Sequence, residues 1–195
     1  MYKSLSALFF IVVLLSGCTG MRLVDNQVSS FAPHPPAADA SYRFERLPSQ
    51  QAEAQQQDQL ETMTEQALVK VGLKRNDSAA QLLAQVRVTE RVERSSADTM
   101  AFGWYVGRRV GHHGGLGLGG GPLFPGLAEL PSYWREIHLT LREIATQAVV
   151  FESRARHEGP WSDSAAILPA MLDAALQDFP RPPSGERRVV IEIRR

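Results

Sequence analysis

The sequence predicts an α+β fold, a two-layer sandwich in which two helices cover one face of a mostly antiparallel sheet of about six strands. Two kinds of pattern lead to this prediction. Several segments alternate apolar and polar residues, as strands do when one face of a sheet is wet. Two other segments repeat apolar residues at helical spacing. The expected order is strand, strand, helix, three strands, helix, strand, within a single domain over residues 23–195.

The strands are expected at five main places besides a short one near residue 42. Apolar residues over 23–31 indicate a first strand, which a proline-rich loop ends because proline cannot donate ladder hydrogen bonds. The alternation is clearest over 82–93. It recurs over 137–142 and 149–156, which we expect to form a hairpin, and over 189–193 near the C-terminus.

Two helices complete the predicted layer. The first should begin at Ser49, a good N-cap residue, and run to Val71. Its first half is rich in Gln and Ala without an apolar face, so only the second half is expected to be buried. Gly72 follows the last periodic residue, where a left-handed C-terminal cap is expected. The second helix should begin at a cap provided by Asp163 or Ser164.

The N-terminus resembles a bacterial lipoprotein signal peptide over residues 1–17. The segment Leu15-Ser16-Gly17-Cys18, which closes an apolar run from residue 5, resembles a lipobox with cleavage between Gly17 and Cys18. The run is too short for a membrane-spanning helix, which needs about 20 apolar residues. An ordinary secretory signal remains the alternative, because short apolar cores and small residues at the cleavage site serve both classes.

Cys18 is the single cysteine of the chain, and lipidation would use its thiol. The resemblance implies three acyl chains, palmitate among them, on the mature N-terminus, which is more than stable anchoring requires. Residues 18–22 would then be the lipidated cysteine and a short tether, since five residues span at most about 18 Å. Thr19 stands where Asp would favour inner-membrane retention, so we expect the periplasmic face of the outer membrane, with the inner membrane less favoured.

The composition argues against several other classes of protein. Lys and Arg total 21 and Asp and Glu total 21, so no excess of positive charge favours nucleic acid as a partner. The five histidines and the acidic residues show no recognisable ligand spacing, and we expect no metal. A single cysteine also means that disulfides cannot stabilise the domain.

A glycine-rich segment over 103–126 holds 10 glycines among 24 residues. Part of it matches the spacing of a dinucleotide-binding loop, but prolines stand where the helix of such a loop would begin, so we expect no cofactor. The segment reads either as a flexible connector between two strands or as a loop that contacts a partner or the membrane. The residues that could make such a contact are aromatic or basic: Trp104, Tyr105, Arg108, Arg109 and Phe124.

Three short motifs along the chain also suggest a family. They are Tyr42-Arg43-Phe44 followed by Leu47-Pro48, then Lys70-Val71-Gly72-Leu73, and finally Ala174-Ala175-Leu176 with Phe179-Pro180. In order and type these motifs resemble the bacterial lipoprotein family catalogued as domain of unknown function 4136, over roughly residues 24–180. The resemblance implies a lipid-anchored envelope domain with no assigned activity.

The sequence therefore favours a non-enzymatic binding or assembly role in the periplasm, with an envelope protein as partner. No Gly-x-Ser-x-Gly elbow is present to raise a nucleophile. An envelope hydrolase is the first alternative, and it predicts a cleft lined by His138, Glu152 and His157. A carrier of a small apolar molecule is the second, and it predicts an unfilled apolar cavity beneath Leu68, Met171 and Phe179.

Overall fold

The computed structural model describes residues 20–37, 39–93, 102–106, 118–122 and 131–194, with 102–106 and 118–122 described by their backbone. The expected signal peptide, including Gly17, and Cys18 lie outside the described residues. In the part that the structure describes, no helix is long and apolar enough to cross a membrane.

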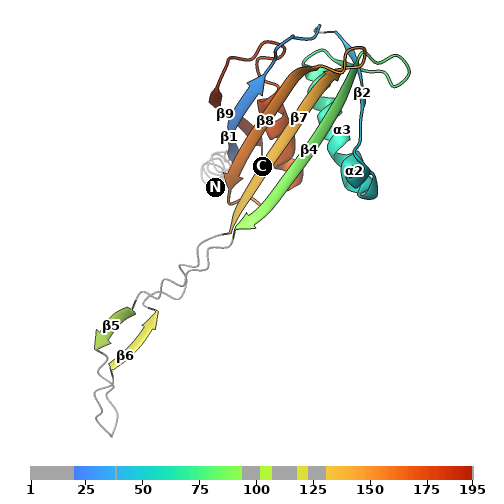
Figure 1. Ribbon diagram of the computed structural model, residues 1–195. Coiled ribbons are helices and arrows are strands. Elements are labelled where there is room, and N and C mark those ends of the chain that lie inside the picture. Colours follow the sequence, from blue (N-terminus) through green and yellow to red (C-terminus); the bar gives the residue numbers. More distant parts are fainter. Residues whose placement is uncertain (1–19, 38, 94–101, 107–117, 123–130, 195) are drawn as a thin grey trace, which may run out of the picture.

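A seven-stranded open sheet forms one layer of the domain (Figure 1). Its strand order is β3-β2-β4-β7-β8-β1-β9. Only β2 pairs in parallel, with β3 and β4, and the other pairs are antiparallel. The bounds are β1 Met21–Phe31, β2 Ser41–Phe44, β3 Lys74–Arg75, β4 Leu82–Glu93, β7 Ser132–Glu143, β8 Val149–Gly159 and β9 Glu186–Arg194.

Helices α3 (Ala54–Lys70) and α4 (Ser164–Ala175) pack against one face of this sheet, preceded by the short helix α2 (Pro48–Ala52). The predicted α+β fold is thus confirmed, with one strand more than expected. The helix expected as continuous from Ser49 is two helices, because Glu53 leaves helical geometry at φ −109° and ψ 43°.

Each long strand divides its side chains between the two faces. On β7, Ile137, Leu139 and Leu141 are fully buried beneath the helices. Their neighbours on the opposite face are half-buried and bind one another across strands, as when Arg156 Nε donates to Glu136 at 2.6 Å. This opposite face, which we call the open face, carries charged residues of both signs that largely neutralise each other.

The core lies between the sheet and α4, which is apolar along most of its length. Ile167, Met171 and Leu172 of α4 are fully buried. Phe151 of β8 packs edge-on against Phe179, with ring centroids 5.0 Å apart. Pro169 lies inside α4, within its first two turns.

The glycine-rich segment contains a pair of strands where the sequence suggested a loop. Strands β5 (Phe102–Val106) and β6 (Leu118–Pro122) form a two-stranded antiparallel sheet, with Trp104 opposite Gly120. The segment connects β4 to β7, which are antiparallel neighbours in the main sheet. The last residue of β4, Glu93, pairs with the first residue of β7, Ser132. Because adjacent strands hold the two ends of the segment together, less entropy is lost when its arms pair.

Several strands share one end of the sheet, which we call the Met21 end. Here β1 begins, β9 ends opposite it at Arg194, and β4 ends opposite the start of β7. In Figure 1 the arrow of β4 ends here, beside the start of β7. The first described residue of the chain, Gly20, immediately precedes β1 at this end.

Candidate functional site

The predicted contact residues fall partly outside the described residues. Arg108, Arg109 and Phe124 lie there, together with Gly17 and Cys18. Trp104 and Tyr105 lie in β5, where their backbones pair with Gly120 and Gly119 of β6. Two residues, Thr19 and Gly20, separate Cys18 from Met21 in the sequence, and three residue steps span at most about 11 Å.

Arginine and tryptophan side chains meet in two pairs at the Met21 end. The Arg22 guanidinium of β1 lies 4.6 Å from the ring centre of Trp161, and that of Arg91 lies 5.0 Å from the ring centre of Trp134. The second pair follows from the register, since Arg91 and Trp134 are directly opposite on β4 and β7. Such cation–π contacts hold the cation and the ring in place together.

Arg135 joins this end of the sheet to the start of α4. Its side chain is 2% exposed. Its Nε donates to the Ser164 hydroxyl and its Nη2 to the Trp161 carbonyl, both at 3.0 Å. Glu90 lies 3.4 Å from Nε on the neighbouring strand. The guanidinium thus fixes the segment between β8 and α4 against the sheet, with Trp161 in a defined position.

The Arg22–Trp161 pair lies on the helix side of the sheet and the Arg91–Trp134 pair on the open face, and exposed apolar side chains lie on the same strands at this end. Met21 is 64% exposed, Leu23 59% and Val92 52%. Tryptophan and arginine are enriched at protein interfaces, and tryptophan also at membrane surfaces. The Met21 end therefore has the composition of a contact surface.

The residues suggested for a hydrolase do not come together. His138 Nε2 lies 2.8 Å from Glu152 on the open face. His157 is on the opposite side of the sheet, buried beneath the helices, where its Nδ1 donates to the Asp25 carbonyl at 2.8 Å. The parity of β8 explains the separation, since Glu152 and His157 differ by an odd number of residues. The expected cleft lined by all three side chains is not formed.

The residues suggested for a carrier are likewise not around one cavity. Leu68 and Met171 are fully buried members of the core. Of the three, only Phe179 lines a surface groove of about 570 Å³. Residues of α3, α4 and β9 and of the segments that follow the helices form this groove, and Val71, Leu176 and Ile191 are among them. Among the described residues, the apolar space that borders these three side chains is this surface groove at Phe179.

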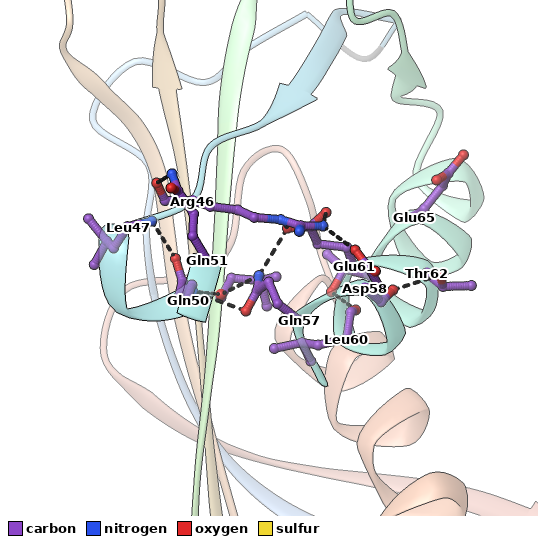
Figure 2. Close-up of polar contacts among 12 residues, drawn as sticks. Arg46, Leu47, Gln50, Gln51, Gln57, Asp58, Leu60, Glu61, Thr62 and Glu65 are labelled. Atoms are coloured by element: carbon purple, nitrogen blue, oxygen red, sulfur yellow. Dashed lines mark hydrogen bonds and ion pairs between the residues drawn. The ribbon is translucent and has the colours of Figure 1, made fainter. Parts of the chain in front are cut away.

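A buried polar network between β2 and α3 was missed by the sequence analysis (Figure 2). Arg46 donates from Nε and Nη2 to Glu61 at 2.6 and 2.7 Å, and from Nη2 to Asp58 at 2.6 Å. Gln57 donates to Glu61 at 3.0 Å, and Gln50 donates to the Val86 carbonyl at 2.8 Å. The network attaches α2 and α3 to β4, and these contacts use both carboxylate oxygens of Glu61 within the fold.

Gln57 is buried, although the first half of the helix was expected to be exposed, and Glu61 is a buried charged residue in the half that was expected to be buried. Sequence periodicity searches for apolar residues, so it could not find a helix face buried through polar side chains. The sequence did hold one signal for this polar contact. Gln57 and Glu61 are four residues apart, and such positions are neighbours on a helix.

Burial and ion pairing shift the pKa values of a few groups. Burial raises the pKa of the Tyr42 hydroxyl well above its ordinary value. Hydrogen bonds to Glu61 and Asp58 raise the pKa of Arg46. A hydrogen bond from Arg188 lowers the pKa of Asp25 on β1. These groups lie in separate parts of the domain, so the shifts do not identify an acid–base pair.

Comparison with solved structures finds similar chains of low identity. A PDZ domain protein from Parabacteroides distasonis ATCC 8503 has 13% identity and a TM-score of 0.49, covering 97% of this chain and 42% of that one. Two PelC dodecamer structures from Paraburkholderia phytofirmans have 10% and 11% identity and TM-scores of 0.41 and 0.43. Each covers 77% of this chain, which in turn covers 94% and 95% of theirs.

This chain therefore spans less than half the length of the PDZ domain protein. Comparison with curated proteins gives no match. A family model, described as a domain of unknown function (DUF4136), matches residues 29–181, which is most of the described domain. The chain belongs to the DUF4136 family.

Proposed function

We propose that this protein is a lipid-anchored lipoprotein of the bacterial cell envelope with a binding or assembly role, placed on the periplasmic face of the outer membrane. The observation that carries the proposal is the sequence Leu15-Ser16-Gly17-Cys18 after a short apolar run. Lipid on Cys18 would hold the domain at the membrane through hydrocarbon.

The geometry of the domain supports an anchor at this position. β1 starts at Met21, so the tether between lipid and sheet would be only a few residues long. The Met21 end would then lie close to the membrane, with Arg22 and Trp161 beside it.

The polar groups of the open face favour binding over catalysis. His138 and Glu152 are both held in cross-strand contacts, and Glu136 is paired with Arg156. General acid–base catalysis needs a group free to reach a substrate proton. The described surface instead offers fixed aromatic and basic side chains, which suit a contact with another macromolecule.

The binding role is tested by photocrosslinking in intact cells. A photoreactive residue replaces Trp104 in β5, and a matched probe replaces Lys74, an exposed residue of β3. The proposal predicts one envelope protein captured from position 104 and not from position 74, together with outer-membrane fractionation of the chain. Capture of lipid alone, or equal capture from both positions, would contradict a protein-binding role for the β5–β6 segment.

A further inference from the structure

Strand β9 forms an open edge of the seven-stranded sheet. Among the described strands it pairs only with β1, and it is nine residues long. An edge strand presents a row of unpaired backbone donors and acceptors, which can pair with another chain. Val190, at the middle of β9, is an apolar residue that is 45% exposed.

The charges of β9 are complementary to those of a second β9 strand that runs antiparallel to it. In an antiparallel pair of two β9 strands centred on Val190, Glu186 stands opposite Arg194 of a second copy, and Arg188 stands opposite Glu192. Each contact occurs twice by symmetry. Opposite charges directly across a strand pair are stabilising, and like charges are destabilising.

The same charges disfavour the neighbouring registers. A shift by two residues in one direction brings Glu186 opposite Glu192, and a shift in the other direction brings Arg188 opposite Arg194. A shift by one residue would exchange the two faces of the strand, turning Val189 and Ile191 away from the helix side. The charge pattern therefore selects a single register.

We propose that β9 pairs with β9 of a second copy of this chain, giving a two-fold symmetric dimer with a continuous sheet. A two-fold interface requires one patch to match itself, and this strand meets that condition. Charged edges usually prevent pairing, because charges of one sign repel a second copy. On β9 the two signs are arranged so that they attract in one register.

The surroundings of β9 fit a second strand. The groove of about 570 Å³ lined by Val71, Leu176, Phe179 and Ile191 reaches β9 at its middle, where Val190 and Ile191 line it. The apolar residues that β9 directs toward the helices, Val189 and Ile191, would bring matching apolar surface from the second copy. Arg188 donates from Nε to Asp25 at 2.8 Å, and its five donors allow it to contact Glu192 of the second copy as well.

Disulfide crosslinking tests the register directly. The full chain carrying V190C is purified in detergent, oxidised with copper phenanthroline and examined on a non-reducing gel. Residues opposite each other in an antiparallel pair have Cα atoms about 4.5–5.5 Å apart, within the range of a disulfide. The matched control is E186C, whose two copies would be eight residues apart, about 26 Å. The wild-type chain gives the background from Cys18.

The proposal predicts a crosslinked dimer for V190C that exceeds E186C and wild type by tenfold or more. Equal crosslinking of V190C and E186C, or none from V190C, would overturn it. Charge reversal gives a second measurement: R194E places like charges opposite Glu186 and should weaken dimerisation in sedimentation velocity by about tenfold. The control R181E makes the same charge change in the loop before β9 and should leave the dimer intact; an equal effect of both would contradict the register. Neither assay depends on the lipid anchor.

Discussion

Both carboxylate oxygens of Glu61 accept hydrogen bonds from the guanidinium of Arg46, at 2.6 Å from Nε and 2.7 Å from Nη2 (Figure 2). The Glu61 side chain is 6% exposed and that of Arg46 27%. This bidentate pair joins the chain after β2 to the middle of α3. Two parallel bonds of this kind fix geometry as well as charge.

Removal of one partner of this pair should be costly. We predict that R46M lowers the free energy of unfolding by about 3 kcal/mol, because it leaves the buried Glu61 carboxylate without its cation. The double variant R46M/E61M should lose less than R46M alone. Urea denaturation of the full chain in detergent measures both values.

The control is K70M, which breaks the exposed pair between Lys70 and Asp173. An exposed pair contributes less than about 1 kcal/mol. If R46M cost no more than K70M, the buried network would not be holding α3 to the sheet.

Tyr42 should make the stability fall at alkaline pH. Its hydroxyl is buried and has no hydrogen-bond partner among the described residues. Because burial raises its pKa in the fold, the unfolded chain ionises first, and stability is lost as the pH rises above about 10.

The variant Y42F tests this assignment by comparison of unfolding midpoints at pH 7 and pH 10.5. At pH 7 it should be neutral or stabilising by about 1 kcal/mol, because it removes an unpartnered buried hydroxyl. The decline between the two pH values should be smaller than in wild type. A large loss at pH 7 would mean that the hydroxyl has a partner in solution.

Gly72 should be hard to replace. It ends α3 with φ 92°, and Leu73 N donates to the Leu68 carbonyl at 3.1 Å across it. A side chain is strained at this φ, so G72A should destabilise the domain by about 1 kcal/mol, whereas G72N should lose less because Asn tolerates left-handed geometry. Thermal unfolding measures the difference. Equal losses for the two variants would point to packing at this position instead of backbone strain.

Much of the fold could be predicted because its signals are local. The alternation over 82–93 predicted β4 with its observed bounds, and Gly72 predicted the end of α3. The hairpin of β7 and β8 was also expected and is confirmed, although both strands are longer than predicted.

The features that were missed depend on contacts between distant segments. β3 has two residues and exists through its parallel pairing with β2, which no local pattern reveals. Gln57 is buried because Gln50, Glu61 and β4 provide partners for its amide. β5 pairs with β6 in a segment whose two ends are held by the neighbouring strands β4 and β7. The sequence shows the glycines of this segment but not that β4 and β7 are neighbours, so it indicated a loop.

The candidate site shows the same division. A motif of four residues sufficed to predict an anchor at Cys18. The contact between Arg22 and Trp161 could not be predicted, since the two residues are far apart in the sequence and meet only in the fold. The sequence could suggest His138, Glu152 and His157 as one group, but the sheet places His157 on the other side.

The most direct test of the account is the mass of the mature N-terminal peptide, isolated from the membranes of cells that express the full chain. We predict cleavage after Gly17 and a Cys18 carrying a diacylglyceryl group and an N-linked acyl chain, both lost in C18S. A mature chain that begins elsewhere, or an unmodified Cys18 thiol, would contradict the proposed anchor.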